Sequence, residues 1–138
     1  MNPKRFALST LAVFVTIFVT DFLIHGVLLK GMYAQTAQLW RSDSEMGTYF
    51  PIMMLSQLLF AAAITYVFPK GYERKGIGEG VRYGLCLFAL FGAHTLGMIA
   101  WLPITVSLLV AWIAAWAVQS LAVGVVCAAV YKAKGGKK

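Results

Sequence analysis

An aspartate and a histidine stand four residues apart in an otherwise apolar stretch, VTDFLIHGVLLKG, at residues 19–31. On an α-helix, Asp21 and His25 would share one face, where the imidazole can hydrogen-bond to the carboxylate. A second histidine, His94, lies inside another apolar stretch. Charged and ionisable side chains inside a membrane mark proton and ion pathways, and they usually face the protein interior or a water-filled cavity. We therefore expect Asp21 to point inward, with His25 or His94 as its hydrogen-bond donor.

Two glutamines belong to the same polar set. Counted along each apolar stretch at about 1.5 Å per residue, Gln57, His94 and Gln119 fall in one layer near the middle of three helices. Asp21 lies about one helical turn above this layer, and His25 lies one turn further outward. Such a layer fits a proton or cation relay in which Asp21 carries the charge, the histidines are its partners and the glutamines supply a polar lining.

Two other interpretations of these residues remain open. Asp21, His25 and His94 could supply three ligands to a metal ion, which needs three or four ligands in a compatible geometry. The same side chains could instead form a hydrogen-bonded polar cluster that only fixes the register of the helices. Apart from that possible metal, the sequence indicates no cofactor.

The elements that position these residues are long apolar runs. Of the 138 residues, 60% are hydrophobic and 12% are charged, whereas soluble domains carry about 25% charged residues. A membrane-spanning helix needs about 20 mostly apolar residues, and the chain offers four such runs, at 6–29, 49–68, 81–100 and 102–131. We therefore predict an all-α, four-helix transmembrane bundle that forms a single domain. Residues 30–48 are its outer loop, 69–80 its cytoplasmic loop, and 132–138 a basic tail.

The distribution of Lys and Arg predicts the orientation in the membrane. Basic loops stay on the cytoplasmic side, and only Lys30 and Arg41 lie on the side opposite to the termini. The basic residues on the side of the termini are Lys4, Arg5, Lys70, Arg74, Lys75, Arg82, Lys132, Lys134, Lys137 and Lys138. Both termini are thus expected in the cytoplasm, with a bacterial inner membrane as the location. The formal net charge of +7 forms no basic face or stripe, so no nucleic-acid partner is expected.

Small and aromatic residues predict how the helices pack. The short turn after the third run makes the third and fourth runs antiparallel neighbours. Ala89, Ala93 and Gly97 recur every four residues, a spacing that lets two helices approach closely, either within the bundle or at a partner interface. Trp112 and Trp116 share one helix face near the bilayer centre. This pair either fills the bundle or presents an aromatic ridge to another subunit, a lipid or a pigment.

The glycine-rich segment GIGEG at residues 76–80 is predicted to be a loop at the start of a helix. A nucleotide-binding loop needs a preceding strand or a GK[ST] ending. Here an apolar run precedes the segment, and that ending is absent. Glu79 and Arg82, three residues apart, add local support to the first turn.

The order of features along the whole chain resembles small four-helix bacterial membrane proteins that are classed as domains of unknown function. The shared features are a first helix that runs into GVLLKGMYAQTAQLW, a second that ends in LFAAAITYVF, a glycine-rich basic turn that leads into EGVRYGL, and a last helix with Trp and Gln. The resemblance implies the four-helix topology and assigns no catalytic residue.

Two functions fit these features. We expect a non-catalytic accessory or assembly subunit of a larger inner-membrane complex, because small-residue stripes and a central tryptophan pair suit contacts with other membrane subunits. The alternative is a small, oligomeric transporter or channel for protons or cations, built on Asp21, His25 and His94. An enzyme is not expected, since the sequence shows neither a cofactor fingerprint nor a pattern of nucleophile and base. The expected partners are the lipid bilayer and either other membrane subunits or further copies of the chain.

Overall fold

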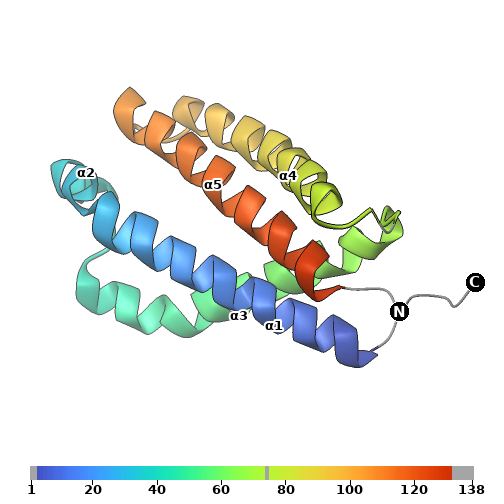
Figure 1. Ribbon diagram of the computed structural model, residues 1–138. Helices are drawn as coiled ribbons and strands as arrows, with labels where there is room; N and C mark the ends of the chain where they lie inside the picture. Colours follow the sequence, from blue (N-terminus) through green and yellow to red (C-terminus); the bar gives the residue numbers. More distant parts are fainter. Residues whose placement is uncertain (1–2, 74, 132–138) are drawn as a thin grey trace, which may run out of the picture.

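Long helices make up the fold. The computed structural model describes residues 3–73 and 75–131, and these residues form helices and connecting turns without a strand (Figure 1). The long helices are α1 (Pro3–Asp21), α3 (Asp43–Val67), α4 (Ile77–Gly97) and α5 (Val106–Val130), and α2 (Lys30–Gln35) is short. With the turns that extend them, the four long helices have the length and apolar composition needed to cross a membrane. The predicted all-α class with four long apolar helices is confirmed.

A π-helical segment, Phe22–Leu28, extends α1 toward α2. Its wider turn is closed by bonds between residues five apart, such as the one from Leu29 N–H to the Ile24 carbonyl oxygen at 2.8 Å. Segments of this kind are rare and are frequently found at functional sites. The apolar run alone predicts a plain α-helix, in which Asp21 and His25 would share one face. The wider π-helical turn changes the angle between the Asp21 and His25 side chains from that of a plain α-helix.

Side-chain caps set where α3 and α5 begin. Ser42 Oγ accepts a hydrogen bond from Glu45 N–H at 3.4 Å, and Glu45 Oε2 accepts one from Ser42 N–H at 3.1 Å. This capping box starts α3 at Asp43, ahead of the predicted start at 49. Thr105 Oγ1 accepts a hydrogen bond from Leu108 N–H at 3.2 Å, so α5 starts after Thr105 rather than at 102.

Helices α4 and α5 form the predicted antiparallel hairpin, and glycines bring their backbones into direct contact. A Cβ atom added at Gly84 would lie 2.7 Å from the carbonyl oxygen of Ser120. One added at Gly124 would lie 2.7 Å from the backbone nitrogen of Gly84, and one at Gly80 would lie 2.8 Å from Ala128 Cβ. The close approach of the two helices therefore requires glycine at these positions.

The small residues that the sequence singles out lie elsewhere on α4. Ala89, Ala93 and Gly97 are exposed, and a Cβ atom at Gly97 would meet nothing within 4 Å. Gly80 and Gly84 supply the contact with α5 instead. The stripe of Ala89, Ala93 and Gly97 therefore takes no part in this packing within the chain.

An apolar core joins the four long helices. Its buried members are Val13, Ile17, Ala61, Ile64, Phe68, Leu87, Val123, Cys127 and Ala128. Helix α1 packs against both α3 and α5. Tyr83 of α4 donates a hydrogen bond to the carbonyl oxygen of Ile64 at 2.8 Å, which ties α4 to α3 beside this core.

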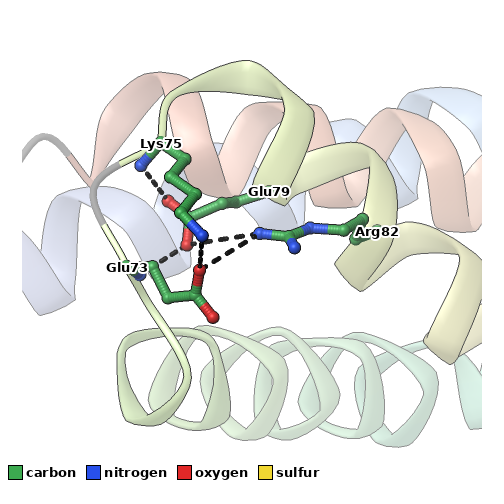
Figure 2. Close-up of polar contacts among 4 residues, drawn as sticks. All are labelled: Glu73, Lys75, Glu79 and Arg82. Atoms are coloured by element: carbon green, nitrogen blue, oxygen red, sulfur yellow. Dashed lines mark hydrogen bonds and ion pairs between the residues drawn. The ribbon is translucent and has the colours of Figure 1, made fainter.

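Glu79 fixes the turn between α3 and α4 (Figure 2). Its side chain is buried and accepts hydrogen bonds from the backbone N–H groups of Glu73 and, at 2.6 Å, of Lys75. Arg82 lies 4.0 Å from Glu79 and 3.7 Å from Glu73. Gly76, with a φ of 79°, turns the chain into α4. The glycine-rich segment thus starts a helix, as its sequence predicts.

The described chain begins and ends at the same end of the molecule. In Figure 1, α1 begins there and α5 ends there, and the turn between α3 and α4 lies at this end as well, opposite to α2. The described basic residues in or next to these segments are Lys4, Arg5, Lys70, Lys75 and Arg82. Arg74 and the predicted basic tail, residues 132–138, lie outside the described residues.

Replacing Gly84 with alanine should destabilise the contact between α4 and α5. The new methyl group would meet backbone atoms of α5, which cannot rotate away as a side chain can. We therefore expect the free energy of unfolding to fall by about 1–3 kcal/mol. Gly97→Ala, on the exposed part of α4, is the matched control and should leave stability unchanged or raise it. Thermal unfolding in detergent measures both variants, and equal melting temperatures would contradict the contact.

Candidate functional site

A cavity of about 410 Å³ lies among the four long helices. It is lined by all five polar residues of the predicted set, namely Asp21, His25, Gln57, His94 and Gln119. The rest of its wall is mainly apolar and aromatic and consists of Ile17, Ile24, Ser56, Phe60, Thr95, Met98, Trp112, Ala115 and Trp116. The volume is typical of a site for a small ligand.

The carboxylate of Asp21 is held by amide groups from two other helices. Gln57 of α3 donates from Nε2 to Oδ2 at 2.6 Å, and Gln119 of α5 donates from Nε2 to Oδ1 at 2.6 Å. The sequence predicts His25 or His94 as the donor. Over residues 3–73 and 75–131, neither histidine is hydrogen-bonded to Asp21, and the glutamines, which were expected only as lining, hold the carboxylate.

Gln119 is fixed in place by further contacts with α1. Its Nε2 atom also lies 2.9 Å from Thr20 Oγ1 and 3.5 Å from the carbonyl oxygen of Ile17. Thr20 donates its own hydrogen to the carbonyl oxygen of Thr16 at 2.8 Å, which leaves its oxygen free to accept. Because Gln119 is buried, these protein groups take the place of water as partners of its amide nitrogen.

The Asp21 carboxyl group has no cationic partner in the described part of the chain, where no Lys, Arg or His nitrogen forms an ion pair with it. The Gln57 Oε1 atom is buried and has no hydrogen-bond donor among the described residues. A carboxylate oxygen can accept more than one hydrogen bond. The cavity thus offers the Asp21 carboxylate as an acceptor suited to a positively charged donor.

His25 is held by Tyr33, a residue of α2. Its Nδ1 atom lies 2.6 Å from the Tyr33 hydroxyl, which also accepts a hydrogen bond from Trp112 Nε1–H at 2.8 Å. Because an indole N–H can only donate, the phenol hydrogen is available to His25 Nδ1. This arrangement suits a neutral imidazole with its hydrogen on Nε2.

Aromatic side chains from α2 and the turn after it pack on the start of α5. The rings of Tyr33 and Trp40 meet edge to face with their centroids 5.4 Å apart, and Trp40 lies 6.0 Å from Trp112. Further along α5, Trp116 stacks on Phe91 with a centroid distance of 4.8 Å. Both central tryptophans therefore pack against rings of their own chain.

His94 lines the cavity from α4, on an exposed part of that helix. Within the described ranges, no three His, Cys, Asp or Glu side chains lie close enough together to hold a metal ion. The metal site considered for Asp21, His25 and His94 is therefore not formed. Amide groups hold the first of these side chains, and a tyrosine holds the second.

Tyr33 and Thr20 contribute to this site although their types and spacing in the sequence do not single them out. Thr20 gave a visible signal, because it is a hydroxyl residue directly beside Asp21 in an apolar run. Tyr33 gave none, since its hydrogen bond with Trp112 joins residues that are 79 positions apart.

The chain matches no family model, and no curated protein or solved structure is detectably similar to it. What the site can do therefore follows from its chemistry. The carboxylate can exchange a proton or bind a cation, the amides can hold it in either state, and the aromatic wall can contact an apolar body.

Tyr33 should titrate at a higher pH than exposed tyrosines. Burial raises the pKa of its phenol above the ordinary value of 10.0, and the hydrogen bond from Trp112 opposes this shift. Trp112→Phe should raise the Tyr33 pKa further, because it removes a donor that stabilises the phenolate. Since the folded-state pKa is raised, the linked stability is present below about pH 10 and is lost as the pH rises through the raised pKa.

Phenolate absorbance measures this titration. The curve of the wild type minus that of Tyr33→Phe reports the one group. A difference curve centred at or below the ordinary tyrosine value would contradict the burial of Tyr33.

Proposed function

We propose that the chain is an integral protein of a bacterial inner membrane, with both termini in the cytoplasm, that carries protons or small cations across that membrane. Four helices long and apolar enough to span a bilayer support the location. The basic residues near the shared end of α1 and α5 support the orientation. The proposed role is non-catalytic, because it needs only the gain and loss of a proton or cation.

The observation that carries this proposal is the Asp21 carboxylate in the wall of a cavity. A charged side chain in a membrane-spanning helix costs about 2.5–3.5 kcal/mol on insertion scales, and such residues mark proton and ion pathways. The two amide donors reduce that cost, but they do not neutralise the charge. A proton or cation bound at Asp21 neutralises the carboxylate, and its release leaves an anion that the amides still hold.

The position of His25 supports access to Asp21 from the side of α2. This histidine lines the central cavity and also a wider hollow of about 830 Å³, which Lys30 and Arg41 line as well. In the opposite direction, the apolar core closes the bundle. On this proposal, Asp21 exchanges its proton or cation with the outer side of the membrane in the conformation described here. Transport then requires the bundle to open at the end that the apolar core fills.

Asp21→Asn should abolish ion movement. In liposomes that contain the purified full-length protein and a pH-sensitive dye, an imposed membrane potential should drive proton uptake through the wild type. The variant should lower the initial rate roughly tenfold or more, because it lacks the group that binds the charge. Asp21→Glu keeps a carboxylate and should retain part of the rate. Asp43→Asn, the same chemical change at the exposed start of α3, is the matched control.

Circular dichroism and gel filtration establish that the Asp21→Asn protein is folded. The transport proposal is wrong if the wild type moves protons, sodium and potassium no faster than protein-free liposomes. It is also wrong if a folded Asp21→Asn protein is as fast as the wild type.

One observation supports a second function, that of an accessory or assembly subunit. Ala89, Ala93 and Gly97 form an exposed small-residue face on α4. Such faces let helices of neighbouring subunits approach closely in lipid. The same face would also serve the self-association of a transporter.

Extraction from the native membrane in mild detergent separates these two functions. Native mass measurement should find other polypeptides at fixed stoichiometry for a subunit, and a fixed number of copies of this chain for a self-associated transporter. Ala93→Leu enlarges the α4 face and should dissociate either assembly, because the helices can no longer approach closely. Leu90→Met, at another exposed position of α4, is the control. A monomer in the wild-type extract would contradict a role for this face.

A further inference from the structure

One side chain is shared by the walls of two hollows. The outer hollow, of about 830 Å³, is lined mainly by residues of α2, of the turn after it and of the start of α3. The central cavity, of about 410 Å³, has Asp21 in its wall. Among the residues that the structure describes, His25 is the one that lines both. It belongs to the π-helical segment Phe22–Leu28, a kind of segment that is frequently found at functional sites.

Tyr33 can hold the His25 ring in both of its protonation states. Its hydroxyl accepts a hydrogen bond from Trp112 Nε1–H at 2.8 Å and lies 2.6 Å from His25 Nδ1, so it can donate its own hydrogen to a neutral ring. A hydroxyl oxygen has two lone pairs and a hydrogen that rotates. When the ring is protonated, Nδ1–H can donate to the same oxygen, and the phenol hydrogen can turn toward the outer hollow, which Tyr33 also lines.

The wall around Asp21 suits a proton better than a metal ion. A proton needs one oxygen atom, whereas calcium takes about six to eight oxygen ligands and potassium exchanges its water shell for rings of carbonyl oxygens. Both carboxylate oxygens of Asp21 already accept a hydrogen bond from an amide. Beyond its polar set, the wall of the central cavity is mainly apolar and aromatic.

The charges of the outer hollow agree with this choice. Lys30 and Arg41 line it together with one carboxylate, that of Asp43. A metal cation has to pass these two basic side chains as a free ion. A proton does not, because water and an imidazole can hand it on from one to the next.

We propose that the ion carried by Asp21 is a proton and that His25 relays it between the outer hollow and Asp21. The imidazole takes a proton from water in the outer hollow and becomes an imidazolium. It then gives one proton, through water in the central cavity, to the Asp21 carboxylate and is neutral again. Release to the outer side is the same sequence in reverse. This inference rests on the proposed function, because it names the ion that Asp21 carries and the group that delivers it.

Two variants separate a relay from a purely structural role of His25. His25→Gln removes the group that titrates but keeps an amide oxygen that can accept the Tyr33 hydroxyl hydrogen. Tyr33→Phe removes that hydrogen bond but keeps the imidazole. In the liposome assay of proton uptake, we expect His25→Gln to lower the initial rate about tenfold or more, and Tyr33→Phe to lower it by no more than about threefold. A structural role predicts the opposite order.

Free imidazole can replace the missing group in a third variant. His25→Ala leaves room for a small ring, and imidazole at equal concentration on both sides of the liposome membrane should raise the rate of this variant at least about threefold. A structural defect would not respond to imidazole. The double variant His25→Ala/Asp21→Asn and protein-free liposomes, each with the same imidazole, are the controls and should show no such rise.

The outcomes distinguish the relay from the transport proposal. Sodium or potassium flux that depends on Asp21 would overturn the proton assignment and leave transport standing. The relay is overturned, again with transport intact, by a folded His25→Gln protein that is faster than Tyr33→Phe. The same holds if imidazole raises the rate of His25→Ala no more than that of the double variant. If neither protons, sodium nor potassium show flux that depends on Asp21, both proposals end.

Discussion

The carboxylate of Asp21 sets the register of three helices. A charged group among apolar helices must be hydrogen-bonded, because an unpaired buried charge costs far more than any single packing contact. Here the donors are the amides of Gln57 and Gln119, both at 2.6 Å. These bonds place one level of α3 and one level of α5 opposite the end of α1. The side chains above and below that level take their positions from this constraint.

Helix α4 is attached by a different kind of contact, and the cavity results from this difference. Gly80, Gly84 and Gly124 join α4 to α5 backbone to backbone. The bond from Tyr83 to Ile64 ties α4 to α3 beside the apolar core, toward the end where the chain begins and ends. Toward α2, the four helices line a cavity of about 410 Å³, with Asp21 among its polar residues. The bundle is thus packed by apolar side chains at one end, and hydrogen bonds of Asp21 join α1, α3 and α5 beside the cavity.

The sequence predicts the long helices well because their apolar runs decide whether a segment spans a bilayer. It also carries a signal for the early start of α3, since Ser42 and Glu45 have the spacing of a capping box. The donors to Asp21 could not be predicted in the same way. When a helix is apolar on every side, its pattern does not say which face meets which neighbour. The choice between amides and histidines depends on that rotation and on the π-helical turn after Asp21.

The use of glutamines rather than a histidine or a basic residue to hold Asp21 has a consequence for its chemistry. A buried ion pair is strongly destabilised when one partner loses its charge, so a lysine or arginine here would lock Asp21 in the ionised form. An amide does not titrate, and it can offer an N–H to a carboxylate or an oxygen to a carboxylic acid. The site can therefore change its protonation or its bound cation without losing the hydrogen bonds that join the three helices. His25, which does titrate, is instead held at the cavity edge by Tyr33, where it can exchange protons without being needed to keep the helices together.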